Sequence, residues 1–301
     1  MLDQTNKVVV VGSGLMGTGI AHAFASSGYA TALVDTNANA LGKARKKIQD
    51  ILATGVKLGK LSAEEAESAN SRLVTAEKLS DVPADSSLLV ETVSESLAIK
   101  HAVVKEAAEL LGADATIATN TSALSVTEIA SVISNPHRVI GMHFFNPVHK
   151  MKLVELVLGI ATDEQTVAVS RQWCDSIGKT SILVNESPGL TTSRMSAMLG
   201  NEAMWMLQEG TASAEDIDTA LRMGFNHPMG PLELGDLTGW DTRLAVLKYL
   251  HSTLGEKFRP CPLIIKMVAA GRLGRKVGHG VYEYDTDGAR VAGSGLKGSN
   301  L

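Results

Sequence analysis

His143 and Glu155 are the two side chains whose types and spacing could carry out acid–base chemistry. Glu155 follows His143 by 12 residues and lies in the otherwise apolar run Leu153–Val157. An ionised carboxylate among such neighbours needs a partner, because burying it alone is expensive. A neutral imidazole could remove the proton of an alcohol while hydride leaves the carbon, and a carboxylate on its other nitrogen would fix the tautomer. Spacing alone, however, favours a structural hydrogen bond inside a core over this catalytic pair.

A glycine-rich turn near the N-terminus could bind the phosphates of a dinucleotide. The apolar run Val8–Val11 leads into Gly12, Ser13, Gly14, Leu15, Met16 and Gly17. Gly12 would permit the tight turn, and Gly14 would let the backbone approach a pyrophosphate. Gly17 would let the following helix pack closely on the sheet, so that its positive N-terminal end faces the diphosphate. On its own, the pattern is also typical of a structural glycine turn.

Asp35 indicates which dinucleotide such a turn would bind. It ends the next predicted strand, Ala30–Val34, and lies 23 residues after Gly12, where a ribose-binding carboxylate is expected. The carboxylate would accept hydrogen bonds from ribose hydroxyls and repel the 2′-phosphate of NADP. Thr36 and Asn37 supply no arginine to pair with that phosphate. The sequence therefore predicts NAD rather than NADP.

An alternating α/β fold must position these residues. Strands are predicted at residues 8–11, 30–34, 88–90, 116–118, 139–142, 154–157 and 181–184. Helical patterns lie between several of them, at residues 17–27, 38–52, 96–111 and 164–177. Such alternation is typical of βαβ units in a mainly parallel sheet. The stretch 120–122 and His143 follow the carboxyl ends of two strands, where ligands bind in open α/β sheets.

The pattern changes after residues 185–189, which we interpret as a hinge. Helical apolar spacing recurs at residues 195–209, 214–223, 242–254 and 262–270. Gly230, Pro228 and Pro231 indicate a turn. We therefore expect an NAD-binding Rossmann domain over residues 1–185 and an all-helical substrate and dimerisation domain over residues 186–284. The polar, glycine-rich tail at residues 285–301 is expected to be disordered.

Composition excludes several classes of protein. The 301 residues carry 28 Lys and Arg against 32 Asp and Glu, a formal net charge of −4. This balance argues against nucleic-acid binding through phosphate neutralisation. Cys174 and Cys261 cannot form a disulfide framework, and no Cys/His spacing indicates zinc or another metal. Without a secretion signal or an apolar run of ~18 residues, we expect a cytoplasmic protein with no membrane partner.

Several motifs, in this order and spacing, resemble those of the L-3-hydroxyacyl-CoA dehydrogenases. They are the glycine motif from residue 12, Asn-Thr-Ser at 120–122, His-Phe-Phe-Asn-Pro at 143–147 and Met-Lys-Leu-Val-Glu at 151–155. Stretches at 187–189, 227–231, 273–278 and 280–282 are similar too, so the resemblance covers residues 7–284. It implies a Rossmann domain followed by an all-α domain. It also implies NAD-dependent oxidation of L-3-hydroxyacyl-CoA to 3-ketoacyl-CoA, or the reverse, with a short chain such as 3-hydroxybutyryl-CoA.

The resemblance further implies roles for individual residues. His143 would be the general base, oriented by Glu155, and Ser122 would donate a hydrogen bond to the substrate oxygen. The cofactor would be held by Gly12, Ser13, Gly14, Leu15, Met16, Gly17, Asp35, Glu95, Lys100, Asn120, Ser122, Asn146 and Lys276. Lys57 and Lys60 lie where the family presents basic residues to the CoA phosphates. Without the resemblance, Ser122 would be interpreted as a helix cap, and Lys100 and Lys276 as solvent-exposed side chains.

Ser193 departs from the family pattern. The family commonly has an asparagine before the arginine of its Ser-Pro-Gly-Phe-x-x-Asn-Arg motif, whereas here Ser193 precedes Arg194. A serine can still donate a hydrogen bond near the substrate, but it lacks the paired donor and acceptor of an amide. Ser193 is therefore kept in the catalytic set.

The resemblance implies a homodimer formed through the helical domain. Two other functions stay open at this point. One is a β-hydroxyacid dehydrogenase acting on a free acid, which would typically use a lysine base. The other is a catalytically silent NAD-binding or structural protein, of the kind recruited as a lens crystallin.

Overall fold

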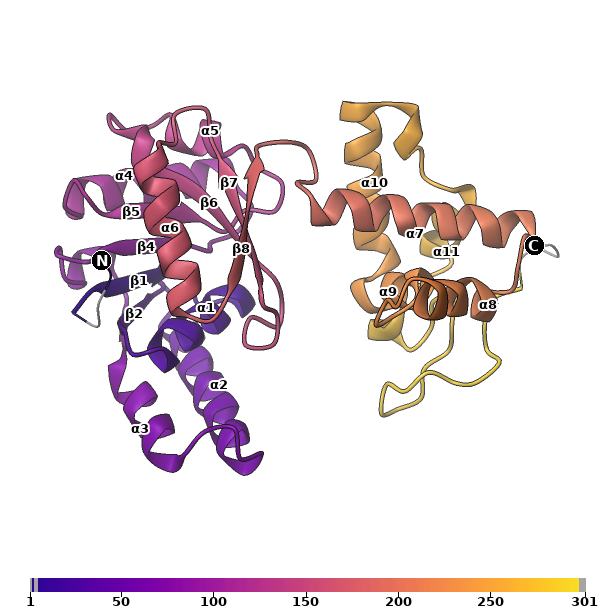
Figure 1. The fold of residues 1–301 in the computed structure, drawn as a ribbon, viewed down its shortest axis with the longest axis horizontal. Helices are drawn as coiled ribbons and strands as arrows, with labels where there is room; N and C mark the ends of the chain where they lie inside the picture. The colour runs from indigo at the N-terminus through magenta and orange to yellow at the C-terminus, as the bar shows by residue number, and fades with distance from the viewer. Residues whose placement is uncertain (1, 3–4, 298–301) are drawn as a thin grey trace. The chain divides into compact units, whose positions relative to one another are not determined.

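The computed structural model describes residue 2 and residues 5–297. The chain divides into two compact units, residues 1–186 and residues 187–301, which we call the N-terminal and C-terminal units (Figure 1). The first is an α/β unit and the second is helical. This is the predicted fold class, a Rossmann domain followed by an all-α domain, and it is confirmed.

An eight-stranded sheet forms the centre of the N-terminal unit, in the order β3-β2-β1-β4-β5-β6-β7-β8. The strands are β1 (Lys7–Val11), β2 (Ala30–Val34), β3 (Leu73–Ala76), β4 (Leu88–Glu91), β5 (Thr116–Thr119), β6 (Val139–Phe144), β7 (Leu153–Leu158) and β8 (Thr180–Asn185). Neighbouring strands are parallel, except that β6 and β7 are antiparallel. Helices cover both faces of such sheets, which explains the continuous apolar runs of β1 and β4.

Helices connect these strands and cover the sheet. They are α1 (Leu15–Ser26), α2 (Ala38–Lys57), α3 (Ala63–Arg72), α4 (Leu97–Leu110), α5 (Val126–Ala130) and α6 (Glu164–Ser176), with short 3-10 helices η1 (Leu79–Asp81) and η2 (Pro136–Arg138). Phe24 of α1, Ile48 of α2 and Trp173 of α6 belong to one core cluster, so these helices share a face of the sheet. Val104 of α4 is buried outside that cluster, against β4 and β5.

The C-terminal unit is built from helices around fully buried Trp240. They are α7 (Thr192–Glu209), α8 (Ala214–Thr219), the π-helical turn η3 (Ala220–Gly224), α9 (Pro231–Thr238), α10 (Trp240–Leu254), η4 (Glu256–Phe258), α11 (Pro262–Ala269) and η5 (Arg275–Val277). Leu207 of α7, Leu247 of α10 and Ile264 of α11 complete this core. The five α-helices thus each contribute apolar residues to a common centre, as amphipathic spacing requires.

Apart from the short 3-10 helices, three elements were not predicted. Helix α3 begins at a capping box, in which Ser62 and Glu65 each bond the other's backbone N–H. Strand β3 is a four-residue edge strand directly after it, too short to show a period. Of the residues predicted to form a turn, 228 and 229 form a bend, and Pro231 is the first residue of α9, where a missing N–H costs nothing.

The segment after residue 284 also differs from expectation. Residues 285–297 were expected to be disordered, but the backbone N–H of Leu296 donates to the carbonyl of Val281. The Glu215 carboxylate accepts a hydrogen bond from Gly295 N–H at 2.9 Å. These contacts fix the segment to the C-terminal unit despite its polar composition. The remainder of the predicted tail, residues 298–301, lies outside the described residues.

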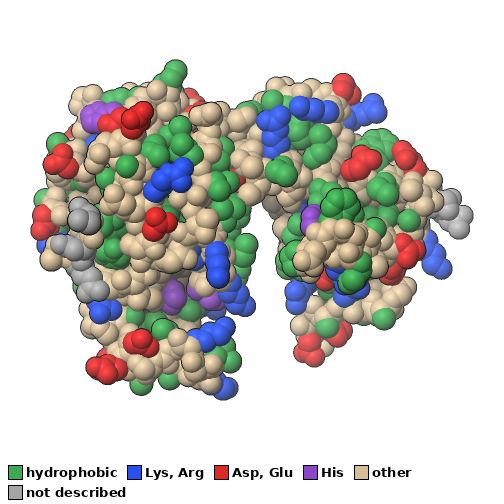
Figure 2. Space-filling model, in the orientation of Figure 1, with side chains coloured by type: hydrophobic (Ala, Val, Ile, Leu, Met, Phe, Trp, Pro, Cys, Tyr) green, Lys and Arg blue, Asp and Glu red, His purple; other side chains and the backbone are tan. Residues whose placement is uncertain are grey.

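The surface charges and the two cysteines do not identify a particular ligand. On the face shown in Figure 2, acidic and basic side chains are interspersed over both units. Cys174 and Cys261 are both buried free thiols. None of the described helices is long and apolar enough to cross a membrane.

Candidate active site and cofactor site

The His143–Glu155 pair is a product of strand register. Strands β6 and β7 are antiparallel, and His143 lies directly opposite Glu155. Directly opposed residues point to the same face of a sheet, so their side chains meet. His143 Nδ1 lies 2.8 Å from Glu155 Oε2, with the histidine 8% exposed and the glutamate fully buried. The predicted pairing of the two side chains is therefore present, and it leaves Nε2 as the nitrogen for a substrate.

The residues around His143 hold the ends of strands β5 and β6 together. The ring of Phe145 lies 4.7 Å from that of His143, centroid to centroid. The side-chain oxygen of Asn120, just after β5, accepts a hydrogen bond from the backbone N–H of Phe144 at 2.9 Å. Asn120, predicted as a cofactor contact, thus also positions the strand that carries His143. Asn146 follows at the exposed end of the same segment.

Ser122 and Glu95 form a second group of polar side chains. Glu95 Oε1 accepts hydrogen bonds from the backbone N–H of Ser122 at 2.7 Å and from its hydroxyl at 3.1 Å. Burial would raise the pKa of Glu95, but hydrogen bonds from Ser122 and the charge of Lys100 outweigh it and lower that pKa. The helix-cap interpretation of Ser122 is wrong, because Ser125 caps α5 by accepting the N–H of Glu128.

Lys100 forms buried ion pairs with Glu95 of this group and with Glu91. It is fully buried, so the solvent-exposed interpretation is wrong. Its Nζ lies 2.9 Å and 3.0 Å from the two oxygens of Glu91, and 3.3 Å from Glu95. Thr119 donates to the same Glu91 carboxylate at 2.6 Å. Glu91 was not predicted, although a glutamate ending the apolar strand Leu88–Glu91 is the same signal that identified Glu155.

The glycine turn has the geometry of an anion-binding helix start. Gly12 has a φ of +102°, and a Cβ on Gly17 would lie 1.8 Å from the Gly12 carbonyl oxygen, so both positions require glycine. A Cβ on Gly14 would meet nothing within 4 Å, which leaves room for a ligand against the backbone. Gly14 is the N-cap of α1 and provides no side-chain cap, so the first N–H groups of the helix can bind a phosphate.

Asp35 lies beside this turn. Its Oδ2 accepts hydrogen bonds from the N–H and the hydroxyl of Ser13 at 2.8 Å and 2.7 Å, and its Oδ1 accepts one from Asn37 N–H at 2.9 Å. Burial would raise the pKa of Asp35, but these hydrogen bonds outweigh it and lower the pKa. Each carboxylate oxygen can accept more than one hydrogen bond, so an ionised Asp35 can still receive ribose hydroxyls.

A cavity of about 340 Å³ opens next to Asp35. Its lining combines polar groups with apolar side chains, among them Val11, Val34, Leu79, Ile99 and Val103. Its position at the ends of β1 and β2 fits the adenosine half of a dinucleotide. The apolar wall was not predicted. One residue of this wall, the apolar Ile99 of α4, is 46% exposed in the structure.

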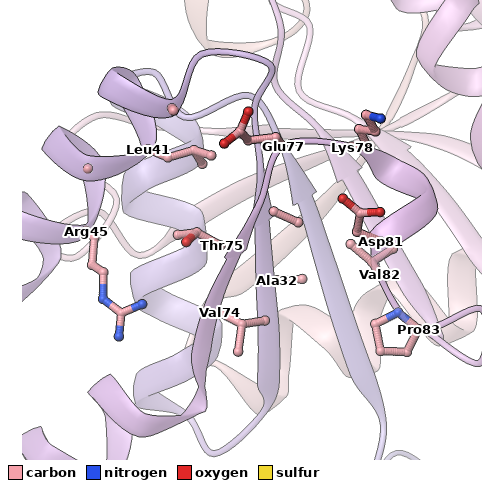
Figure 3. Close-up of a pocket in the computed structure, with 13 residues that line it drawn as sticks. Ala32, Leu41, Arg45, Val74, Thr75, Glu77, Lys78, Asp81, Val82 and Pro83 are labelled. Atoms are coloured by element: carbon pink, nitrogen blue, oxygen red, sulfur yellow. The ribbon is translucent and has the colours of Figure 1, made fainter.

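A larger cavity, of about 690 Å³, lies along the edge strand β3. Figure 3 shows Arg45 on one side of it and Glu77, Lys78 and Asp81 on the other. None of the predicted site residues lines this cavity. Its mixture of charges does not indicate one ligand class. The candidate catalytic and cofactor-binding residues lie instead at the strand ends described above. Among the described residues, no cluster of three or more His, Cys, Asp or Glu could hold a metal.

The other predicted residues are placed as follows. Lys57 ends α2 and Lys60 lies in the turn after it, both exposed. In the C-terminal unit, Ser193 lies in the first turn of α7. Lys276 is partly exposed, as expected without the resemblance, but its Nζ is 2.7 Å from both oxygens of Asp241. These contacts belong to the C-terminal unit alone.

Comparison with known proteins gives one consistent result. Family models described as 3-hydroxyacyl-CoA dehydrogenase match residues 7–187, as the NAD binding domain, and residues 189–284, as the C-terminal domain. A probable 3-hydroxybutyryl-CoA dehydrogenase of Bacillus subtilis (strain 168) is 39% identical over 283 residues, covering 94% of this chain and 98% of the relative. The 3-hydroxybutyryl-CoA dehydrogenase of Bradyrhizobium diazoefficiens is 42% identical over 285 residues, covering 94% and 97%. A crystal structure of (S)-3-hydroxybutyryl-CoA dehydrogenase from Ralstonia eutropha matches with a TM-score of 0.88 at 40% identity, covering 93% of this chain and 99% of that one.

Proposed function

The chain belongs to the 3-hydroxyacyl-CoA dehydrogenase family, and from this premise we propose how its residues act and which substrate they take. The enzyme uses NAD to oxidise L-3-hydroxyacyl-CoA to 3-ketoacyl-CoA, or catalyses the reverse reduction. When bound, NAD supplies the hydride acceptor. The observation that carries the mechanism is the buried hydrogen bond between His143 and Glu155 at the end of β6.

His143 is the general base of the oxidation. Glu155 accepts a hydrogen bond from Nδ1–H, so the lone pair is on Nε2 and faces the substrate hydroxyl. Nε2 takes the hydroxyl proton as hydride leaves the same carbon, and the resulting imidazolium is stabilised by the carboxylate. On substrate binding, Ser122 turns its one hydroxyl hydrogen away from Glu95 and donates it to the oxygen that becomes the ketone. In the reduction, His143 returns the proton.

The cofactor contacts are distributed around the glycine turn. The N–H groups at the start of α1, beside Gly14, bind the diphosphate, and Leu15 and Met16 follow in the first turn of that helix. Asp35 binds the adenosine ribose. Glu95, Asn146 and Lys276 are proposed contacts of the remaining half, while Lys100 holds Glu95 in place through its ion pair.

We propose a short acyl chain, as in 3-hydroxybutyryl-CoA, because the relatives above carry that name over nearly their whole length. The intact Ser122, His143 and Glu155 disfavour a silent structural protein, and a histidine base disfavours the lysine-dependent free-acid enzymes. Kinetics with acyl-CoA substrates from C4 to C16 would test the chain length. Ser193→Asn in the same series would test its contact with substrate, because unchanged KM and kcat would place it outside the pocket.

The decisive experiment follows the absorbance of NADH with acetoacetyl-CoA. We expect oxidation of NADH by the wild type and a kcat lower by about 10²–10⁴-fold in His143→Gln, because the base is removed. NAD binding should be retained in the variant, since its contacts lie at the glycine turn. Undiminished kcat in His143→Gln would reject this mechanism, and NAD binding without any turnover by the wild type would favour the silent protein.

We also propose that the enzyme is a homodimer formed through its C-terminal unit and works in the cytoplasm. Exposed apolar side chains on that unit support the interface, among them Met195, Met223, Phe225, Tyr249 and Ile265. Two buried free thiols are consistent with a reducing compartment. Light scattering coupled to size-exclusion chromatography measures the mass directly, and a monomer at micromolar concentration would contradict the dimer.

A further inference from the structure

The proposed reaction leaves one fully buried carboxylate of the N-terminal unit without a role, that of Glu91. Glu91 ends β4, and the register of the parallel strands places it beside Thr119, which ends β5. Its Oε1 accepts a hydrogen bond from Val93 N–H at 2.7 Å, and its Oε2 accepts one from the Thr119 hydroxyl at 2.6 Å. Lys100 of α4 donates to both oxygens, at 2.9 Å and 3.0 Å. One side chain therefore joins the ends of two strands to α4 and to the connection before it.

Folding alone does not explain why a charged pair lies at this position. The side chains of Glu91 and Lys100 are both completely removed from solvent. Taking two charges out of water costs free energy that their attraction often does not fully offset, so well-packed apolar residues in place of a buried ion pair are often as stable or more stable. The rest of β4, residues 88–90, is buried and apolar. The pair at the end of this strand therefore requires an explanation outside the stability of the sheet.

The ammonium group of Lys100 also contacts the candidate active site. Its Nζ lies 3.3 Å from Glu95 Oε2, and the side chain of Glu95 is 42% exposed. The other oxygen of Glu95 accepts the N–H and the hydroxyl of Ser122. Burial raises the pKa of Glu95, whereas the Ser122 N–H and then the charge of Lys100 lower it and keep the carboxylate ionised. Contacts thus run without a break from the buried Glu91 to the serine that is proposed to bind the substrate oxygen.

We propose that Glu91 is a positioning residue for the reaction, because it holds Lys100 against Glu95, and Glu95 in turn fixes the backbone of Ser122. An ammonium group has three N–H donors. Two of them point at the Glu91 oxygens, so the group cannot turn, and the third has the Val93 carbonyl at 3.5 Å and Glu95 at 3.3 Å from Nζ. Glu91 is fully buried and acts only through these contacts. The inference rests on the proposed function, which assigns the Ser122 hydroxyl to the substrate.

Three single variants of the full-length protein test this role. Glu91→Gln keeps the shape of the side chain but turns an NH2 group toward the Lys100 ammonium, and since two donors cannot bond each other, Lys100 should move. Thr119→Val removes only the hydroxyl that donates to Glu91, and it replaces Glu91→Gln if that variant does not fold. The matched control is Thr31→Val. Thr31 is also a buried threonine of the sheet, but its hydroxyl donates to the Tyr29 carbonyl at the start of β2.

The first measurement does not depend on turnover. Amide hydrogen exchange followed by NMR reports the Ser122 N–H, which donates to Glu95 at 2.7 Å. We expect its protection to fall about tenfold in Glu91→Gln, about threefold in Thr119→Val and less than about twofold in Thr31→Val. The Asn120 N–H donates to the backbone carbonyl of Glu91 at 2.8 Å and should keep its protection throughout. Equal losses at the two amides would show that the strand ends had opened, and unchanged protection of Ser122 would show that Glu91 does not position it. Either result would overturn the proposal.

The second measurement is a double-mutant cycle in kcat, with acetoacetyl-CoA and NADH. We expect kcat to fall about 100-fold in Ser122→Ala, about tenfold in Glu91→Gln and about threefold in Thr119→Val, with Thr31→Val within about twofold of the wild type. In the Ser122→Ala background, Glu91→Gln should lower kcat by less than about twofold, because it acts through the hydroxyl already removed.

A further tenfold loss in the double variant would overturn the role of Glu91, since a structural effect would add to the loss of Ser122. If the wild type did not turn over acetoacetyl-CoA, the proposed function would fail. Hydrogen exchange at the Ser122 amide would then still decide whether Glu91 positions that residue.

Discussion

Each unit buries a carboxylate almost completely. The two carboxylates differ in their hydrogen-bond partners, and this difference separates a catalytic role from a structural one. Glu155 is fully buried in the N-terminal unit and Asp236 is 1% exposed in the C-terminal unit. Glu155 is hydrogen-bonded to the titratable ring of His143. Asp236 accepts hydrogen bonds from Trp240 Nε1 at 2.6 Å and Val281 N–H at 2.8 Å on Oδ1. On Oδ2 it accepts them from Tyr282 N–H at 2.9 Å and Tyr284 OH at 3.0 Å.

The comparison shows that burial of a charge does not by itself identify a catalytic group. The donors to Asp236 are two backbone N–H groups, the indole N–H of Trp240 and the hydroxyl of Tyr284, none of which titrates near neutral pH. Its oxygens therefore act as hydrogen-bond acceptors that fix the segment 281–284 on α9. The surrounding chain is shaped to this carboxylate, because a Cβ on Gly280 would lie 2.0 Å from Asp236 Oδ1. Glu155 instead holds a ring whose second nitrogen can take a proton. One carboxylate serves the fold, and the other serves the reaction.

The largest effect is expected at Glu155, the catalytic member of this comparison. In Glu155→Gln, kcat should fall by about 10³–10⁴-fold, because an amide can select the wrong tautomer of His143 and cannot stabilise its cation. The free energy of unfolding should change by about 1 kcal/mol or less, since the amide keeps a hydrogen bond to the ring. Steady-state kinetics and urea unfolding measure the two quantities. Glu65→Gln, in the capping box of α3, is the matched control and should leave both unchanged. If the fall in kcat of Glu155→Gln were fully explained by a smaller folded fraction, Glu155 would be a structural residue like Asp236.

Asp236→Asn should have the reverse signature. The amide would place an NH2 group against donors that need an acceptor, at a cost of about 2–4 kcal/mol in unfolding free energy. The fluorescence of Trp240, whose ring donates to Asp236, reports unfolding of this region directly. The fraction that remains folded should retain kcat within a few-fold. Asp50→Ala, at an exposed position on α2, is the control and should shift stability by less than about 0.5 kcal/mol. A selective loss of kcat at full stability would contradict this assignment.

A smaller effect is expected at Asp35, a carboxylate that is only partly buried. In Asp35→Ala, the preference for NAD over NADP should fall by about 10–100-fold, because the variant loses a charge-assisted hydrogen bond to ribose and the repulsion of a 2′-phosphate. The ratio of kcat/KM for the two cofactors measures this preference. An unchanged ratio would remove Asp35 from the cofactor site, and it would then belong with Asp236 as a residue that supports only the fold.

The sequence allowed prediction of those features that depend on local pattern. The valine run of β1, the glycine turn and the change to helical spacing after residue 185 each have a local signature, and each predicted element is present. The pairing of His143 with Glu155 was also predictable, because a charge in an apolar strand needs a partner. The partner of Asp236 was not, since Val281 is 45 residues away and only the tertiary fold brings the two together.

The same limit applies to the remaining surprises. The turn predicted from Pro228, Gly230 and Pro231 ends in a helix start at Pro231 that was not predicted, because proline at a first helical position and proline in a turn give the same local signal. The segment 285–297 was expected to be disordered from its composition, and its order depends on acceptors such as Glu215 that lie far away in the sequence. Without the family resemblance Lys100 would be interpreted as solvent-exposed, because its partner Glu91 can be recognised only once β4 is known to end at that glutamate.

The smallest expected effect concerns acid, and it compares two partly exposed carboxylates of the N-terminal unit with the two most buried carboxylates of the C-terminal unit, whose pKa values shift in opposite directions. The hydrogen bonds of Asp35 and Glu95 outweigh burial and lower their pKa values, so their stabilising contribution is present above the unfolded pKa and is lost as the pH falls through the folded one. Burial raises the pKa values of Asp218 and Asp236 in spite of their hydrogen bonds. These two groups therefore destabilise the folded state as the pH rises through their folded values, and acid relieves that penalty.

On acidification from pH 6 to pH 4, the N-terminal unit should consequently lose protection before the C-terminal unit. Hydrogen exchange followed by mass spectrometry, on the intact chain, resolves peptides from β1, β2 and α4 separately from those of α9 and α10. The variant Glu95→Gln removes one of the acid-sensitive groups and should reduce the loss of protection in the N-terminal unit without affecting α9. If α9 and α10 lost protection first, the raised pKa of Asp236 would not determine the acid stability of the C-terminal unit. Glu155 and Asp236 would then differ only in their hydrogen-bond partners.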